Sequence, residues 1–333
     1  MFERVKKVIT AEEVKKLLPV GEKIASVKAD NDETLRNLVS GKDKRFLLVC
    51  GPCSADNEDA VAEYCVKLKA LSDRYDDRLV IVPRVFTAKP RTNGEGYLGM
   101  MYQPEGVSVD VDEGVRRSRG MMRRIIEETG LPISDELLYP EYYDYNDDLV
   151  SYYFIGARSS ENPEHRNVGS GLGVAVGVKN STGGNLMSLA GSVYSVNTPK
   201  EFLLKGEQVR TEGNPYAHAV FRGFVDESGV FYPNYSDNSL RTYLMLCENY
   251  GVINRFVMVD CSHANSSKQT IKQIKTARSI IRERNKVIGS LMLESYLFEG
   301  RSDSGEYGVS RTDNCIGFED TESLVKDLYD SLG

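Results

Sequence analysis

Tryptophan is absent from the 333-residue sequence. Long hydrophobic runs are also missing, because no stretch approaches the roughly 20 apolar residues that a membrane-spanning helix needs. The N-terminal stretch MFERVKKVITAEEVKKLLPV contains acidic residues and no apolar segment of signal-peptide length. We therefore expect a cytoplasmic protein with no membrane partner.

The sequence has no excess of basic residues. It contains 42 Lys and Arg against 49 Asp and Glu, which gives a net charge of -7. Nucleic acids and anionic membranes favour a basic protein surface, so neither is expected as the main partner. With 41% hydrophobic and 27% charged residues, the chain has the composition of a globular protein with a sizeable core.

Six cysteines occur without the paired spacings of a disulfide framework, which fits a reducing compartment. Two of them, Cys50 and Cys53, form a Cys-x-x-Cys pattern that is typical of thiol-disulfide exchange proteins. Thioredoxin-like proteins usually carry a Trp before this pattern, and none is present here. A thiol-disulfide protein that uses Cys50 and Cys53 remains an alternative, beside the interpretation of Cys50 as a small core residue.

Apolar segments of strand length alternate with segments of helical periodicity along the chain. Near-continuous apolar strands separated by helices indicate a parallel sheet that is covered by helices. Eight such units predict an α/β fold of the closed (β/α)8 TIM barrel type. The predicted strands are residues 45–51, 79–85, 132–137, 153–158, 174–180, 217–223, 255–263 and 287–295.

Two segments fall outside the eight repeats. Residues 1–44 are predicted to form an N-terminal helical extension that packs on the barrel or on a neighbouring subunit, before a catalytic barrel over residues 45–333. Residues 181–216 are rich in Gly, Asn, Thr and Ser and contain the short apolar pieces SVYSV and EFLL. We interpret 181–216 as an inserted hairpin or loop between the fifth and sixth strands.

Each predicted strand ends in a polar or ionisable residue. Catalytic residues of TIM barrels lie at the C-terminal ends of the strands and in the loops that follow. A barrel core needs only apolar layers, so stability does not explain eight such residues. They are Cys53, Arg84, Glu136, Arg158, Lys179, Arg222, His263 and Glu294, and Lys89 and Arg91 follow in the loop RVFTAKPRTNGEG.

The cations of this set would converge at the end of the barrel where the strands have their carboxyl ends, which we call the mouth. The protein as a whole is acidic. Clustered cations repel each other unless anions neutralise them, and arginine forks suit phosphate and carboxylate groups. Six cations exceed what one monophosphate requires, so we expect two small anionic substrates. Crowding by like charges should also lower the pKa of Lys89 and Lys179. The six are Arg84, Lys89, Arg91, Arg158, Lys179 and Arg222.

A second group combines a thiolate, an imidazole and two carboxylates. Such a mixed set of sulfur, nitrogen and oxygen ligands suits one divalent ion of Mn, Fe, Co or Zn. The residues come from four distant places, and a lone His is more often structural, so the pattern alone leaves both interpretations open. They are Cys53, His263, Glu294 and, in the last loop SRTDNCIGFED, Asp313.

Several short motifs together resemble the type I 3-deoxy-D-arabino-heptulosonate 7-phosphate (DAHP) synthases. The resemblance spans about residues 46–325, and SHANSSKQ and KPRT are its most specific parts. The motifs are GPCS (51–54), KPRT (89–92), GAR (156–158), GVKN (177–180), FRG (221–223), DCSHANSSKQ (260–269), LES (293–295) and TDNCIGFEDT (312–321).

The resemblance implies a transferase of the shikimate pathway of aromatic amino acid biosynthesis. It would condense phosphoenolpyruvate with erythrose 4-phosphate and water to give DAHP and phosphate. By carry-over, the metal ligands are Cys53, His263, Glu294 and Asp313, and the phosphoenolpyruvate-binding residues are Arg84, Lys89, Arg158, Lys179 and Arg222. Arg91 and Thr92 would bind erythrose 4-phosphate, and Lys89, Lys179 and Glu136 would act in catalysis, with Glu136 positioning or deprotonating water.

Other activities and partners stay open beside this one. A sister synthase makes 3-deoxy-octulosonate 8-phosphate from arabinose 5-phosphate, although KPRT at 89–92 favours the four-carbon aldehyde. A non-catalytic anion-binding protein on the same barrel is another alternative. We expect a homo-oligomer, a dimer or a tetramer. An aromatic amino acid effector would bind near residues 136–150, 168–175 and 181–216.

Overall fold

The structure is a computed structural model that describes residues 1–333 except 92, 93 and 284. The described residues hold an eight-stranded parallel sheet in the order β2-β1-β12-β11-β8-β5-β4-β3. Its strands are β1 (Phe46–Gly51), β2 (Leu79–Pro83), β3 (Ile133–Glu136), β4 (Val150–Ile155), β5 (Ala175–Lys179), β8 (Ala217–Phe221), β11 (Val257–Asp260) and β12 (Ile288–Glu294). Each of the eight predicted strands is confirmed.

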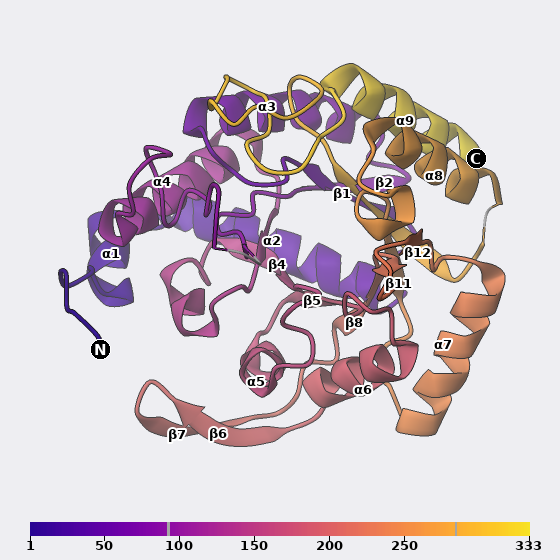
Figure 1. The fold of residues 1–333 in the computed structure, drawn as a ribbon, viewed down its shortest axis with the longest axis horizontal. Helices are drawn as coiled ribbons and strands as arrows, with labels where there is room; N and C mark the ends of the chain where they lie inside the picture. The colour runs from indigo at the N-terminus through magenta and orange to yellow at the C-terminus, as the bar shows by residue number, and fades with distance from the viewer. Residues whose placement is uncertain (92–93, 284) are drawn as a thin grey trace.

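The sheet closes on itself between β2 and β3. Arg84, directly after β2, forms a parallel bridge with Ser134 of β3. The Ser134 carbonyl accepts the Val85 N–H at 3.0 Å, and the Ser134 hydroxyl donates to the Pro83 carbonyl at 3.0 Å. The fold is therefore the predicted (β/α)8 barrel, and Figure 1 shows helices ringing the strands.

The outer helices begin and end where the sequence signals place them. The Asn57 side chain accepts the Ala60 N–H and caps α3, and Gly130 and Gly251 end α4 and α7 with φ of 68° and 75°. These helices are α3 (Glu58–Arg74), α4 (Val111–Thr129), α5 (Pro163–Gly171), α6 (Leu186–Asn197), α7 (Asp237–Tyr250), α8 (Thr270–Glu283) and α9 (Phe318–Ser331), with two 3-10 turns, η1 (Pro140–Tyr145) and η2 (Ala264–Ser266).

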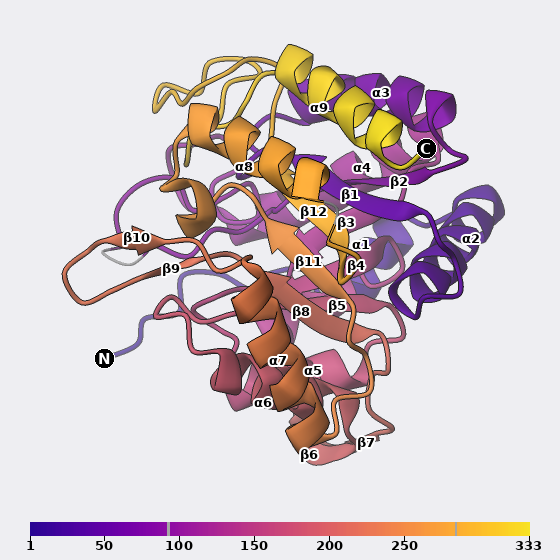
Figure 2. The ribbon, with the colours of Figure 1, turned by 90° about the vertical axis from the view of Figure 1, so that its right-hand side faces the viewer.

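The N-terminal residues form two helices, α1 (Ala11–Leu17) and α2 (Glu22–Val39). Leu35, Leu38 and Val39 of α2 are buried in one cluster with inward-facing strand residues such as Leu47 and Val82. Figure 2 shows α2 at the end of the barrel that lies opposite the loops following the strands. One end of the barrel is thus closed by α2, and the other end is left for a site.

The segment 181–216 is more regular than the expected hairpin or loop. Its first half is a helix, α6, in which Leu189, Val193 and Val196 are buried at helical spacing. Its second half is an antiparallel hairpin of β6 (Lys200–Leu204) and β7 (Glu207–Thr211). The expectation was wrong for the helical half, because the apolar residues of SVYSV continue a helical period that begins at Leu189.

A second short hairpin, β9 (Phe224–Val225) with β10 (Phe231–Tyr232), follows β8 and extends on the side of the loops (Figure 2). None of the helices in the described part of the chain is both long and apolar enough to span a bilayer.

Candidate active site at the carboxyl ends of the strands

The predicted strand-end residues meet at the mouth that α2 leaves open. Parallel strands bring their carboxyl ends to the same end of the barrel. Glu136, Lys179 and Glu294 are the last residues of β3, β5 and β12, and Arg84 and Arg222 directly follow β2 and β8. The remaining three lie two or three residues beyond their strands: Cys53, Arg158 and His263.

Three potential metal ligands form one cluster. Cys53, Glu294 and Asp313 each offer a ligand atom within 4.8 Å of the others. The His263 Nε2 atom lies 3.7 Å from Glu294 Oε1, and its Nδ1 atom lies 2.7 Å from Asp260 Oδ2. A carboxylate on Nδ1 orients the imidazole and leaves Nε2 free to bind a metal, which is the usual arrangement behind a histidine ligand.

The donor set fits a divalent cation. Glu294 is 2% exposed, and its buried Oε1 atom accepts no hydrogen bond from the described residues, although Arg84 Nη2 forms an ion pair with it at 3.1 Å. Although burial acts in the opposite direction, the charges of Lys268, Lys89 and His263 hold the pKa of Asp313 below its usual range. A buried carboxylate beside a second carboxylate and a thiol is the kind of place that a divalent cation stabilises.

Two buried cations contact the Cys53 corner of this cluster. Lys89 Nζ donates to the Cys53 carbonyl at 2.9 Å and lies 3.1 Å from the Cys53 sulfur. Arg84 is fully buried, donates to the Pro52 and Cys53 carbonyls at 3.1 Å, and has Nη2 3.1 Å from Glu294 Oε1. Burial lowers the pKa of Lys89, but the Cys53 thiolate and Glu294 outweigh it, so the pKa is raised. The expected lowering was therefore wrong for Lys89, because anions and not only cations surround it.

Lys179 lies on the other side of the same mouth. Its Nζ donates to Asp260 Oδ2 at 3.0 Å, and both side chains are buried. Burial is the main cause that lowers the pKa of Lys179, and the charge of Arg84 lowers it further. The expected lowering is confirmed here, with desolvation as a larger cause than the crowding by cations. Asp260 thus orients both His263 and Lys179.

Phe86 is a buried aromatic residue that the sequence interpretation missed. Its ring centroid lies 3.8 Å from Arg84 Cζ, 5.9 Å from Lys89 Nζ and 5.6 Å from Lys179 Nζ. The face of an aromatic ring attracts cations. The Phe86 ring therefore attracts three cations of the mouth, which partly offsets the repulsion between them.

Arg158 and Arg222 lie near enough to each other for their charges to interact. Arg222 is 7% exposed, and its Nη1 atom is buried without a hydrogen-bond partner among the described residues. Burial and the charge of Arg158 lower the pKa of Arg222. Arg158 itself is exposed. Two arginines that repel each other, one with an unpaired N–H, make a receptor for an anion.

Glu136 lies against the backbone of the GAR motif. A Cβ atom added to Gly156 would come within 2.0 Å of the Glu136 carboxylate oxygen. Glycine at this position therefore leaves the space that the Glu136 side chain occupies. The negative charge of Glu136 acts on both Lys89 and Lys179 and favours their protonated forms, although burial still lowers the pKa of Lys179 overall. The structure thus brings Glu136 into the same mouth as the cations.

The predicted erythrose 4-phosphate residues are only partly described. The Arg91 Nε donates to the Tyr97 carbonyl at 3.0 Å, which folds its side chain back over its own loop. Thr92 lies outside the described residues.

Three asparagines behind the mouth were also missed as functional residues. The Asn180 amide oxygen accepts the Arg222 N–H at 2.9 Å and an Asn234 amide N–H at 3.0 Å. Asn265 donates to the Phe221 and Asp260 carbonyls at 2.9 and 2.8 Å. The network fixes the ends of β8 and β11. Asn180 lies in GVKN and Asn265 in DCSHANSSKQ, whereas Asn234 lies outside both motifs, and the bonds that join the three span 31 to 54 positions.

The two cysteines of the Cys-x-x-Cys pattern have different surroundings. All six cysteines are buried and free. Burial raises the pKa of Cys50 to about 12, which leaves almost no thiolate at neutral pH. Cys53 instead faces the ligand cluster, and its N–H donates to the Cys315 sulfur at 3.3 Å. These surroundings argue against a dithiol that cycles between Cys50 and Cys53.

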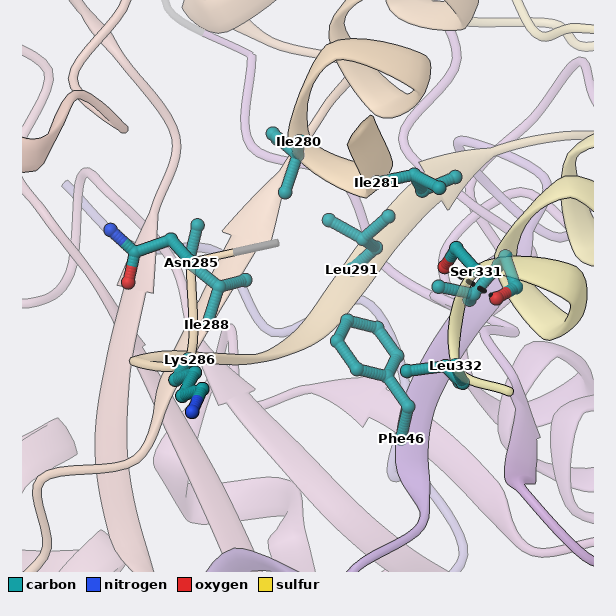
Figure 3. A pocket seen from close by; sticks show the side chains of 10 residues that line it. Phe46, Ile280, Ile281, Asn285, Lys286, Ile288, Leu291, Ser331 and Leu332 are labelled. Atoms are coloured by element: carbon teal, nitrogen blue, oxygen red, sulfur yellow. Dashed lines mark hydrogen bonds between the residues drawn. The ribbon is translucent and has the colours of Figure 1, made fainter. Parts of the chain in front are cut away.

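A separate cavity of about 240 Å³ lies between α8, α9 and the first residues of β1 and β12. Figure 3 shows its mainly apolar lining, which includes Phe46, Ile280 and Leu291. Lys286 is the one charged residue among the described residues that line it. The cavity lacks paired acids, bases or cations and is not a candidate for the chemistry.

Comparisons with known proteins point to one family. A family model described as "DAHP synthetase I family" matches residues 22–326. A curated relative from Escherichia coli strain K12, "Phospho-2-dehydro-3-deoxyheptonate aldolase, Tyr-sensitive", is 34% identical over 97% of this chain and 93% of its own length. A "Phospho-2-dehydro-3-deoxyheptonate aldolase" from Haemophilus influenzae is 36% identical over 94% of this chain and 88% of its own.

A solved structure has the same fold over the whole chain. It is described as a phospho-2-dehydro-3-deoxyheptonate aldolase from Francisella tularensis SCHU S4 and aligns with a TM-score of 0.93 at 30% identity. The alignment covers 100% of this chain and 98% of that one. Fold, length and family model therefore agree.

Proposed function

This chain belongs to the DAHP synthetase I family, and from that premise we propose that it is a transferase that condenses phosphoenolpyruvate with erythrose 4-phosphate and water. The products are DAHP and phosphate, and the reaction belongs to aromatic amino acid biosynthesis. The observation that carries the proposal is the single mouth in which a buried set of cations adjoins the cluster of Cys53, Glu294 and Asp313.

The metal ligands that we propose are Cys53, His263, Glu294 and Asp313. Three of them offer atoms within 4.8 Å of one another, and His263 Nε2 lies beside Glu294. A divalent ion bound there, one of Mn, Fe, Co or Zn, would supply Lewis acidity for the negative charge that develops on the aldehyde oxygen. Asp260 keeps the His263 ring in the orientation that ligation needs.

Phosphoenolpyruvate carries a carboxylate and a phosphate, and the cations of the mouth match them. Arg158 and Arg222 suit one anionic group, because Arg222 keeps an unpaired N–H there. Arg84, Lys89 and Lys179, gathered at the Phe86 ring, suit the other group close to the metal ligands. Bound in this way, the enol carbon is held next to the place where the aldehyde must lie.

Proton transfer falls to residues at the centre of the mouth. Lys179, whose pKa burial lowers, can release and take up a proton more readily than an exposed lysine. Lys89 stays protonated and stabilises negative charge. We propose that Glu136 positions or deprotonates the water that adds to phosphoenolpyruvate, and that Arg91 and Thr92 bind the phosphate of erythrose 4-phosphate.

Phosphoenolpyruvate consumption tests the proposal directly. The purified chain should consume phosphoenolpyruvate with erythrose 4-phosphate, lose this activity on chelation and regain it when a divalent metal is restored. Arabinose 5-phosphate in place of erythrose 4-phosphate tests the sister reaction. Absence of turnover with every metal and both sugars would overturn the proposed function.

We also propose that an aromatic amino acid regulates the enzyme and that the chain assembles as a homo-oligomer. The regulation is supported by relatives that are named Tyr-, Phe- and Trp-sensitive. A kinetic titration with the three amino acids tests the regulation, and insensitivity to all three would remove it.

A further inference from the structure

Asp135 is a buried carboxylate that the proposed chemistry does not use. It precedes Glu136 on β3, and successive strand side chains point to opposite faces, so Asp135 faces away from the mouth. Its side chain is 5% exposed. Among the described residues no Lys or Arg forms an ion pair with it, and none is among the main causes that set its pKa. A buried carboxylate without a cation is costly to keep, which calls for a reason.

Three N–H and O–H groups satisfy this carboxylate, and two of them belong to one residue. Asp135 Oδ1 accepts the Thr87 N–H at 3.0 Å and the Glu136 N–H at 2.7 Å. Asp135 Oδ2 accepts the Thr87 hydroxyl at 2.7 Å. The carboxylate therefore holds Thr87 through both its backbone and its side chain.

Thr87 is the residue whose position fixes the loop after β2. It directly follows Phe86, whose ring supports three cations, and it precedes Lys89 by two residues. The Thr87 carbonyl accepts the Met101 N–H at 2.9 Å, so both backbone polar groups of Thr87 are bound. A shift of Thr87 would move the Phe86 ring and the Lys89 ammonium together.

We propose that Asp135 is a positioning residue that clamps Thr87 and thereby holds Phe86 and Lys89 in the geometry that phosphoenolpyruvate requires. The proposal rests on the proposed function. Hydrogen bonds to an ionised acceptor are roughly twice as strong as neutral ones, so the ionised carboxylate holds Thr87 more firmly than an amide of the same shape would. A small displacement of catalytic groups can lower turnover strongly, which gives the clamp its importance.

The clamp costs stability, and the cost depends on pH. Burial raises the pKa of Asp135 to about 7, although its bonds to Thr87 act in the other direction. The charge of the adjacent Glu136 also raises this pKa, and the neighbouring Tyr153 stays neutral because burial raises its pKa well above the usual value. A carboxyl with a raised pKa in the folded state contributes stability at low pH and loses it as the pH rises through about 7.

Asp135→Asn separates positioning from stability. The amide oxygen can still accept the two N–H groups, and the amide NH₂ can donate to the Thr87 hydroxyl, so the neutral variant keeps the shape. We expect its Tm to exceed that of the wild type, by an amount that grows from pH 4.5 to pH 8. At pH 8 kcat/KM for phosphoenolpyruvate should fall about tenfold, as expected when charge-assisted bonds become neutral ones. Thr87→Val should lower kcat/KM similarly, and the double variant should lose less than the product of both effects.

Asp148→Asn is the matched control. Asp148 pairs with the buried Arg119 at 2.7 Å, and among the described residues no hydrogen bond joins Asp148 to Phe86, Thr87 or Lys89. This variant should have a lower Tm and an unchanged kcat per folded molecule. A merely structural Asp135 would behave like Asp148, so an Asp135→Asn enzyme that is no more stable than the wild type or is fully active overturns the proposal.

Amide hydrogen exchange tests the contact between Asp135 and Thr87 without a measurement of turnover. The Thr87 amide should exchange faster in Asp135→Asn and Asp135→Ala than in the wild type and in Asp148→Asn. If the wild type consumes no phosphoenolpyruvate, the proposed function is wrong. The exchange rate of the Thr87 amide still shows whether Asp135 holds Thr87 in place. If turnover is normal and the Thr87 amide is equally protected in all four proteins, the clamp itself is refuted.

Discussion

At the scale of single residues, Cys50 and Cys53 show how neighbours with the same side chain take different roles. Both are buried and lie three residues apart. Cys50 is a strand residue of β1 in the apolar layer under the helices. Cys53 lies beyond the strand, with Lys89 at 3.1 Å and two carboxylates in reach. The Cys-x-x-Cys spacing was visible in the sequence, but only the fold distinguishes the two sulfurs.

The pair provides a matched test of the metal site. Cys53→Ala removes a thiolate from the proposed ligand set, so we expect the purified protein to hold far less divalent metal and to lose most of its turnover. Cys50→Ala removes a sulfur of equal burial from the core and should lower the Tm without changing bound metal per folded chain. Metal content by atomic absorption, with both Tm values, decides the matter. Equal metal content in the two variants would exclude Cys53 as a ligand.

At the scale of elements, the repeating pattern of the sequence was sufficient for the barrel. Eight apolar segments predicted β1, β2, β3, β4, β5, β8, β11 and β12, because a strand buried on both faces is a continuous apolar run. The helix α6 was missed, since the segment 181–216 that contains it is rich in Gly, Asn, Thr and Ser as a whole. The bounds of β4 also differ, as it begins at Val150 and not at residue 153.

The repeating pattern of strands and helices also predicted the strand-end residues, but not the side chains that position them. TIM barrels place catalytic groups at the strand ends, so the sequence suffices to list Lys179 or Glu294. The support from Phe86, Asp260 and the clamp by Asp135 depends on side-chain contacts across the barrel. Asp135 and Thr87 are 48 positions apart, and Asp260 and Lys179 are 81 positions apart, so local spacing in the sequence does not reveal these contacts.

The β6–β7 hairpin is an element whose removal should leave the mouth intact. Lys200 and Thr211 pair at its base, so their Cα atoms are about 5 Å apart and a short Gly-Ser turn can replace the residues between them. The hairpin packs on α5, where the Ser170 and Thr211 hydroxyls meet at 2.7 Å. We expect the replaced enzyme to keep its turnover and to lose any inhibition by Phe, Tyr or Trp. Steady-state kinetics with each amino acid measures this, and retained inhibition would locate the effector elsewhere.

At the scale of the whole molecule, charge is distributed unevenly. The chain has a net charge of -7, yet its mouth gathers four buried cations, Arg84, Lys89, Lys179 and Arg222, together with the exposed Arg158. The surface ion pairs lie around the outside of the barrel, for example Arg278 with Asp327 at 2.9 Å. An acidic protein with a local basic mouth attracts small anions to one place and offers little to a polyanion.

This distribution predicts that small anions stabilise the folded chain even without turnover. Phosphoenolpyruvate or inorganic phosphate at 100 times its Kd should add about 2.7 kcal/mol to the free energy of unfolding, seen as a rise in Tm. Arg222→Ala removes the unpaired buried guanidinium, so its Tm without anion should equal or exceed that of the wild type, and the anion-induced rise should shrink. Arg278→Ala, which removes an exposed arginine of α8, should keep the full rise. Because the mouth is largely buried, moderate NaCl should reduce the anion-induced rise in Tm only in part. An equal rise in Tm for the wild type, Arg222→Ala and Arg278→Ala would show that the anions bind outside the mouth.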